Sequence, residues 1–193
     1  EIDVEGWADV RRLHLTGTLS SPQVDLDARV RQLEVLGLAP YDVEVDLNYD
    51  ARAVRGRVGV SARQVEVAWV ELGSHGFPIR VDLSTGEFAI SGGRPMDVVA
   101  HVERLKFGEL TALLPEGVEL ATRGYVALEL IADGTPDAPN AEATLLLNDA
   151  TFEIPVGEED WRVTDANLNL DVTHESVGGR SIVALEVLGA LGG

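Results

Sequence analysis

The amino-acid sequence predicts an all-β protein built around one elongated antiparallel sheet. Apolar and polar residues alternate with a period of two in many short segments of the 193-residue chain, which is the pattern of strands with one buried face. Turn-forming Gly, Pro, Asn and Asp residues separate these segments at short intervals, which favours antiparallel pairing between consecutive strands. About a dozen strands are expected, more than an ordinary sheet contains.

The strand segments follow one another along most of the chain. Their apolar positions are Val24, Leu26, Ala28 and Val30; Val43, Val45, Leu47 and Tyr49; Val65, Val67 and Trp69; Ile79, Val81 and Leu83; Leu168, Leu170 and Val172; and the less regular run Ile182, Ala184 and Val187. The residues between them are mostly Asp, Glu, Asn and Arg. Each strand is therefore expected to have one apolar and one charged face.

One segment departs from this alternation. Phe107, Leu110 and Leu114 lie at helical spacing, and Pro115 ends the pattern. The sequence therefore predicts one short helix near 105–114, of about two turns, that covers an open end of the sheet.

An internal repeat links two distant parts of the chain. Gly17–Pro22 and Gly134–Pro139 share a Gly-Thr-x-x-x-Pro frame, each between two strand segments. We therefore predict a repeated module over residues 13–35 and 128–154, within a single β-rich segment that spans residues 1–193 of a longer repetitive protein.

The composition excludes several classes of function. With 15 Lys+Arg against 33 Asp+Glu, the net charge is −18, and Lys106 is the single lysine. Such a chain lacks the basic patch that nucleic acid or an anionic membrane surface requires. It has no cysteine, so disulfides, thiol nucleophiles and cysteine-type zinc sites are excluded.

No catalytic constellation is recognisable. The histidines, which are His14, His75, His101 and His174, are not arranged at metal-ligand spacing. There is no Gly-x-Ser-x-Gly elbow, and the acidic run 158–160 lacks the pattern of a calcium loop. We therefore expect no enzyme activity, no metal and no cofactor.

The order of several short motifs resembles the TamB family of translocation and assembly proteins, within the AsmA-like group. The motifs are Leu13–Val24, Gly76–Ile79, Leu105–Pro115, Gly134–Pro139, Leu145–Asn148 and Thr151–Pro155. Each motif is short, so the resemblance rests on the order and spacing of the motifs together. It covers roughly residues 10 to 193.

The resemblance implies a location and a set of partners. TamB-like proteins are periplasmic proteins of diderm bacteria, anchored in the inner membrane, and their β-rich body is a curved, taco-like sheet with an apolar concave interior. They partner an Omp85-type outer-membrane barrel and act in autotransporter assembly and phospholipid transport. This chain is then expected to be an internal periplasmic segment, with the membrane anchor and the contacts to the barrel lying elsewhere.

The leading hypothesis is a groove that carries phospholipid acyl chains between the two membranes. A one-sided apolar sheet must either be covered by a second layer or enclose an apolar ligand. The predicted lining residues are Val43, Val45, Leu47, Val65, Val67, Trp69, Val81 and Leu83. The alternatives are a scaffold that helps outer-membrane proteins or autotransporters to assemble, and a structural β-sandwich module of a surface protein.

Overall fold

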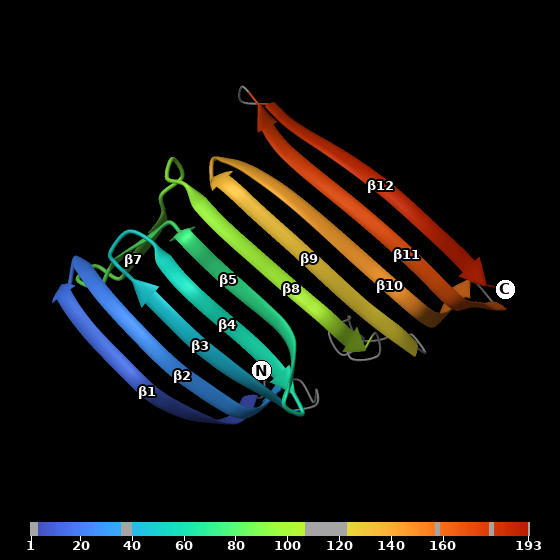
Figure 1. The fold of residues 1–193 in the computed structure, drawn as a ribbon, viewed down its shortest axis with the longest axis horizontal. Helices are drawn as coiled ribbons and strands as arrows, with labels where there is room; N and C mark the ends of the chain where they lie inside the picture. The colour runs from blue at the N-terminus through green and yellow to red at the C-terminus, as the bar shows by residue number, and fades with distance from the viewer. Residues whose placement is uncertain (1–3, 36–39, 107–122, 157–158, 178–179, 193) are drawn as a thin grey trace.

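The computed structural model describes residues 4–35, 40–106, 123–156, 159–177 and 180–192. Within these ranges the chain forms twelve β-strands and no helix. Ten strands build one large curved antiparallel sheet, and two form a small separate hairpin (Figure 1). The prediction of an all-β antiparallel fold is confirmed.

The strands differ widely in length. They are β1 (Val4–Thr18), β2 (Ser21–Val35), β3 (Tyr41–Tyr49), β4 (Val54–Ala62), β5 (Val65–Phe77), β6 (Ile79–Asp82), β7 (Glu87–Ile90), β8 (Met96–Lys106), β9 (Arg123–Thr135), β10 (Ala138–Val156), β11 (Glu159–Val177) and β12 (Arg180–Gly192).

The large sheet follows the order of the sequence, except that β6 and β7 leave it. Its order is β1-β2-β3-β4-β5-β8-β9-β10-β11-β12. All nine neighbouring pairs are antiparallel, so the two edge strands, β1 and β12, run in opposite directions. The edge strands lie at opposite ends of the sheet, which is open (Figure 1).

The predicted helix near 105–114 is wrong at its first two residues. Leu105 and Lys106 are the last residues of β8, where they pair with Val126 and Tyr125 of β9. The remainder of the predicted helix lies outside the described residues. A few apolar residues at helical spacing do not by themselves specify a helix. Here backbone pairing with β9 holds Leu105 and Lys106 in a strand instead.

The two Gly-Thr turns have the same local structure. Gly17 pairs with Pro22 and Gly134 with Pro139, and the two glycines have φ angles of 83° and 88°. In both turns a Cβ on the glycine would press against the backbone oxygen of the residue four positions later. Glycine is needed at both positions because other residues rarely adopt this conformation. Both turns lie at the same end of the strands, because β1 and β9 run in the same direction.

The β6–β7 hairpin folds against this end of the sheet. Leu83 donates its backbone N–H to the oxygen of Leu19 in the first Gly-Thr turn, at 2.8 Å. After β7, the oxygen of Gly92 accepts a hydrogen bond from the N–H of Asp137 in the second turn, at 3.0 Å. The segment between β5 and β8 therefore connects the two turns, which are far apart in the sequence.

Bulges distort the sheet at several places, and one lies in the second half of β10. The register between β10 and β11 shifts on both sides of the pair Ala150–Ala166. The residues before them, Asp149 and Asp165, both have a φ of 51°. Because a bulge adds a residue to one strand, it bends the strand and increases its twist. Ala150 and Ala166 are fully buried at this bend.

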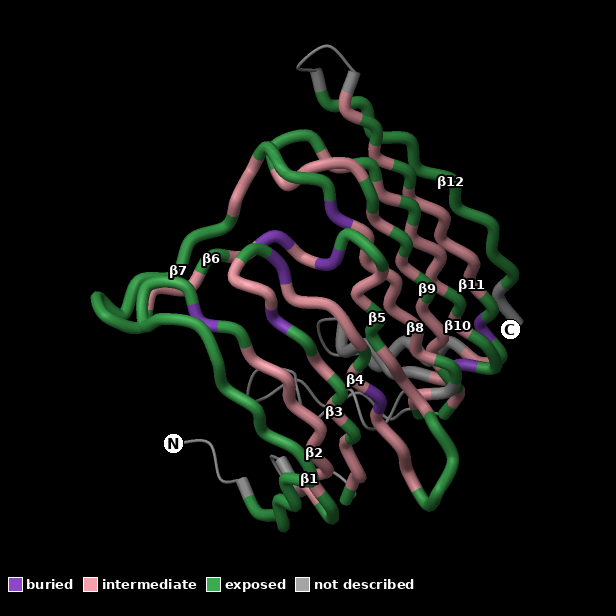
Figure 2. The backbone as a smooth tube through the Cα atoms, turned by 60° about the vertical axis from the view of Figure 1, so that its left-hand side comes forward, coloured by how far each residue is buried: buried purple, intermediate pink, exposed green. Residues whose placement is uncertain are grey.

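Few of the described side chains are buried, because these residues form no second sheet of comparable size that covers the first. The buried hydrophobic residues of the described chain are Tyr49, Ala53, Met96, Ala150 and Ala166. Half-buried and exposed residues dominate the rest of the backbone (Figure 2). This arrangement does not match a β-sandwich, in which two sheets bury a common core.

Candidate functional site

One face of the large sheet is lined by two continuous rows of aliphatic residues, which we call the apolar face. Each row crosses all ten strands, and all twenty residues are Ala, Val or Leu. The first row is Val10, Ala28, Val45, Val58, Val70, Ala100, Leu130, Ala143, Val172 and Leu185, and the second is Ala8, Val30, Val43, Val60, Ala68, Val102, Leu128, Leu145, Leu170 and Val187. At about 4.8 Å between strands, ten strands give rows roughly 43 Å long.

The apolar face is more shielded than the opposite face. On β10, Leu145 and Leu147 of the apolar side are half-buried, whereas Leu146 on the other side is 37% exposed. On β9, Leu130 is half-buried and the neighbouring Ile131 is 44% exposed. A sheet that curves toward its apolar face brings the side chains of that face closer together. This curvature accounts for the lower exposure of the apolar-face residues on these two interior strands. Val70 is an exception at 39%, opposite the small Ala100.

The opposite face, which we call the polar face, carries the charged residues. One of its rows runs Asp9, Arg29, Glu44, Gly59, Trp69, His101, Glu129, Thr144, Asp171 and Glu186. Two faces of such different polarity allow the sheet to present one side to water and the other to an apolar ligand.

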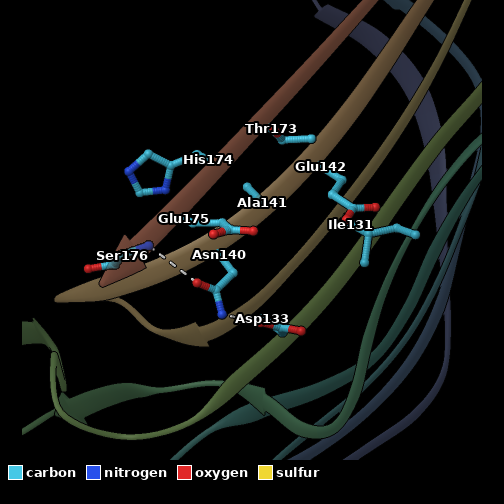
Figure 3. Close-up of a pocket in the computed structure, with 9 residues that line it drawn as sticks. All are labelled: Ile131, Asp133, Asn140, Ala141, Glu142, Thr173, His174, Glu175 and Ser176. Atoms are coloured by element: carbon cyan, nitrogen blue, oxygen red, sulfur yellow. Dashed lines mark hydrogen bonds between the residues drawn. The ribbon is translucent and has the colours of Figure 1, made fainter. Parts of the chain in front are cut away.

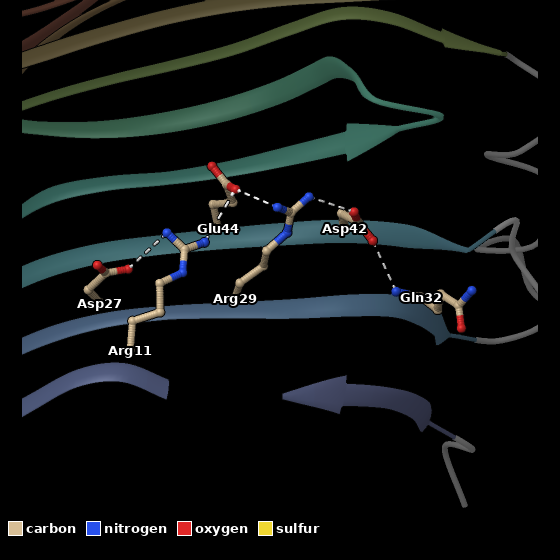
Figure 4. Close-up of polar contacts among 6 residues, drawn as sticks. All are labelled: Arg11, Asp27, Arg29, Gln32, Asp42 and Glu44. Atoms are coloured by element: carbon tan, nitrogen blue, oxygen red, sulfur yellow. Dashed lines mark hydrogen bonds and ion pairs between the residues drawn. The ribbon is translucent and has the colours of Figure 1, made fainter. Parts of the chain in front are cut away.

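Ion pairs connect the polar side chains of β1, β2 and β3. Arg29 contacts Asp42 at 2.9 Å and Glu44 at 3.4 Å, and Arg11 contacts Asp27 and Glu44 at 3.6 Å (Figure 4). The N–H of Gln32 and the guanidinium of Arg29 donate hydrogen bonds to Asp42 and lower the pKa of its carboxyl. This network keeps the long arginine side chains on the polar face.

Four of the predicted lining residues lie on the apolar side of the sheet. Val43 and Val45 belong to the two rows of the apolar face, and Leu47 lies in the adjacent row on the same side, between Leu26 and Gly56. Val65 pairs with Ala62 and so also faces this side.

Trp69 lies on the polar face, separated from the other predicted lining residues. Ser61 pairs with Glu66 but Val60 pairs with Ala68, so β5 carries one extra residue at Val67. This bulge reverses the alternation, and Trp69 lies opposite Gly59. There its ring stacks on His101 at 5.7 Å and lies 5.0 Å from the guanidinium carbon of Arg57.

Val81 and Leu83 also lie outside the rows, because the β6–β7 hairpin leaves the large sheet. The N–H of Val81 donates a hydrogen bond to the hydroxyl of Tyr49, at 2.8 Å. Tyr49 pairs with Val24 and Val54, on the apolar side of the sheet. The hairpin therefore lies over one end of the apolar face, where Tyr49 is only 7% exposed and Pro78 is fully buried.

The predicted lining omits the half of the apolar face that β8 to β12 provide, although Leu170, Val172 and Val187 of its rows are among the apolar strand positions expected from the sequence. Alternation is visible there, as in Leu128, Leu130 and Ala132 of β9. In β8, however, Val98, Val99 and Ala100 are all apolar, so the sequence does not show which of them share a face.

A shallow pocket of about 610 Å³ lies across β9, β10 and β11 (Figure 3). Its lining includes the acids Asp133, Glu142 and Glu175, with Asn140 linking Asp133 to the N–H of Ser176. The mixed polar lining does not match a lipid tail. Within the described part of the chain, no group of three or more His, Asp and Glu residues is arranged to hold a metal ion.

Two further findings concern membrane-spanning helices and known relatives. Among the described residues, no helix that could cross a membrane is found. No family model, curated protein or solved structure matches the sequence or the fold, so the resemblance to the TamB family stays a prediction.

Proposed function

We propose that this chain binds phospholipid acyl chains along its apolar face and lets them move along the face, as part of a TamB-like protein that transfers lipid between two membranes. The observation that carries the proposal is the pair of aliphatic rows that cross all ten strands without a polar residue. Their side chains are not covered by a second layer of protein within the described chain. A surface of this kind is stabilised when an apolar ligand displaces water from it.

The energetics favour acyl chains over smaller or more polar ligands. Each CH₂ group that is removed from water contributes about 0.8 kcal/mol, so a tail lying on an open face and buried on one side gains on the order of 5 kcal/mol. The rows offer no hydrogen-bonding side chain, so binding depends on contact area and allows a tail to slide. A headgroup would remain in water at the open side.

Site-specific photocrosslinking tests the proposal. A photoreactive residue in place of Leu128, on the apolar face, is expected to capture phospholipid when the protein is made in the presence of native membranes. The matched control is the adjacent Glu129, which is exposed on the polar face of the same strand. Equal capture at the two positions, or no capture at Leu128, would contradict lipid binding by the apolar face.

A second candidate function, the assembly scaffold, draws support from the open edges. β1 and β12 each have one unpaired side in the large sheet, and an unpaired edge can accept a strand of an unfolded client. This function predicts crosslinks from the edge strands to polypeptide, whereas the lipid function predicts crosslinks from the central rows to lipid.

A further inference from the structure

The large sheet forks next to the second Gly-Thr turn. β10 and β11 are paired as far as Ala141 and His174. Beyond this pair, β10 remains paired with β9 and β11 remains paired with β12, and the described residues show no further pairing between β10 and β11. Pro139, two residues before Ala141, has no N–H that could continue the pairing. The two hairpins therefore separate at this point.

The pocket of about 610 Å³ lies in this fork and is lined from both faces of the sheet. Ala141, His174 and Ser176 line it from the apolar side. Glu142 and Glu175 line it from the polar face. The His174 ring projects away from Glu142 (Figure 3). The fork therefore brings the margin of the apolar face and a group of polar-face acids into one pocket.

His174 is the one polar side chain in a third row of the apolar face, which lies beside the first aliphatic row. This third row also crosses all ten strands, and it is Leu13, Leu26, Leu47, Gly56, Leu72, Val98, Ala132, Ala141, His174 and Val183. His174 is half-buried and makes no hydrogen bond or ion pair with another described residue. Its imidazole N–H is therefore available to an acceptor on a ligand.

Small side chains lead away from His174 across the neighbouring strands. Ala141 and Ala132 follow it in the third row, on β10 and β9, and Ala143 and Ala100 lie in the first aliphatic row beside them. Side chains of this size leave room for an acyl chain close to the backbone, over about 14 Å for the three strand spacings from β11 to β8. A tail that lies on these alanines brings the polar end of its lipid to His174.

The acids of the fork determine which headgroup fits there. Glu142 and Glu175 are exposed and form no ion pair with another described residue, and the whole chain carries a net charge of −18. A headgroup with a net negative charge would be repelled by this field. A zwitterionic headgroup instead carries an ammonium group beyond its phosphate, so the phosphate can meet His174 while the ammonium meets the two carboxylates.

We propose that the fork between β10 and β11 binds the headgroup of a zwitterionic phospholipid, with the phosphate at His174 on the apolar side and the ammonium at Glu142 and Glu175 on the polar face. This inference rests on the proposed function, because the tail of the same lipid lies on the apolar face. The imidazole N–H donates a hydrogen bond to a charged phosphate oxygen, which is stronger than a bond between neutral groups. The fork then gives a resting position to a lipid that otherwise slides along the rows.

Nuclear magnetic resonance of the full chain with isotope-labelled histidine tests the inference. The protein is titrated with three probes that have tails of equal length: a short-chain phosphatidylethanolamine, the corresponding phosphatidylglycerol, and a fatty alcohol that has no phosphate. We expect phosphatidylethanolamine to bind most tightly and to shift the imidazole signals of His174. The signals of His14 and His101, which lie on the polar face, serve as the internal control and should stay in place.

Variants separate recognition of the headgroup from binding of the tail. His174→Leu should weaken binding of phosphatidylethanolamine on the order of tenfold and leave binding of the alcohol unchanged, because the bond to the phosphate is lost. His174→Gln keeps an N–H donor and should retain most of the affinity. His101→Leu makes the matched change on the polar face and should have no effect. Glu142→Gln combined with Glu175→Gln should remove the preference for phosphatidylethanolamine over phosphatidylglycerol. Circular dichroism should show that every variant keeps its strands.

The three probes distinguish failure of this inference from failure of the proposed function. Equal binding of all three probes with unshifted His174 signals would overturn the headgroup site and leave tail binding by the apolar face intact. Tighter binding of phosphatidylglycerol than of phosphatidylethanolamine would overturn the assignment of the ammonium to the two acids. Failure of every probe to bind, the alcohol included, would contradict the proposed function itself and the headgroup site with it.

Discussion

Single residues hold the ends of the strands in this sheet, and Asp97 at the start of β8 is the best example. Its carboxylate accepts hydrogen bonds from the N–H of Gly76 at 2.7 Å and from the hydroxyl of Ser74 at 3.3 Å. Burial raises its pKa, but the backbone N–H groups of His75 and Gly76 and the Ser74 hydroxyl outweigh this, so the pKa lies below 3.8. The ionised form therefore fixes the end of β5, where the chain leaves the large sheet.

Replacing Asp97 with Asn should reduce stability in a pH-dependent way. Because the folded pKa is lowered, the contribution is complete above pH 3.8 and is lost as the pH falls through the folded value. We expect Asp97→Asn to lower the free energy of unfolding by about 1 kcal/mol near pH 7, since an amide accepts fewer hydrogen bonds. Denaturant unfolding at several pH values measures this. The difference from wild type should shrink below pH 3.8, and a difference that stays constant down to low pH would contradict a role for the ionised carboxylate.

Among the elements, the β6–β7 hairpin stands apart, because its contacts with the large sheet are few. Apart from the hydrogen bonds to the two Gly-Thr turns, it is held by the bond from the N–H of Val81 to the hydroxyl of Tyr49. Phe88 and Ile90 of β7 are 68% and 58% exposed, so this strand adds little buried area. The hairpin is therefore expected to open more readily than the ten-stranded sheet.

Tyr49→Phe tests how the hairpin is held on the apolar face. The change removes the hydroxyl and leaves the ring, so we expect the Val81 amide to lose about 1 kcal/mol of protection, or roughly fivefold in hydrogen-exchange rate. Amides in the ladder between β3 and β4 serve as the internal control and should exchange at wild-type rates. Unchanged protection at Val81 would show that other contacts hold the hairpin.

At the scale of the whole molecule, the net negative charge opposes association between sheets that each have an open apolar face. Acidic side chains dominate the polar face, and the net charge is −18. Repulsion between such molecules opposes contact between their apolar faces. We therefore expect the solubility of the protein to depend on pH, because the surface acids lose their charge as the pH falls.

Acidification toward the isoelectric point near 4.4 should cause aggregation through the apolar face. Light scattering during a pH titration measures the onset, and a mild detergent should suppress it by covering the aliphatic rows. Aggregation that detergent does not affect would indicate that the polar face or the unfolded chain is responsible.

The sequence predicted the strand-rich fold, the antiparallel order and the polarity of most strands, because a period of two is a local property of a chain with one face in water. It also placed Val43, Val45 and Leu47 on one side of a strand, and they share one side of β3, which pairs with β4 without any register shift. It placed Trp69 with them, because regular alternation does not reveal the extra residue at Val67 that reverses the faces of β5.

The sequence by itself determined that this chain forms strands with one aliphatic and one acidic face. Only the tertiary structure decided which strands join. Ile79, Val81 and Leu83 alternate like the others, yet β6 pairs with β7 outside the large sheet, and β8 takes the place beside β5. Alternation along one strand sets the polarity of its faces, whereas strand pairing depends on backbone hydrogen bonds between residues far apart in the chain. Those pairings align the two rows across ten strands and leave β1 and β12 open at the edges.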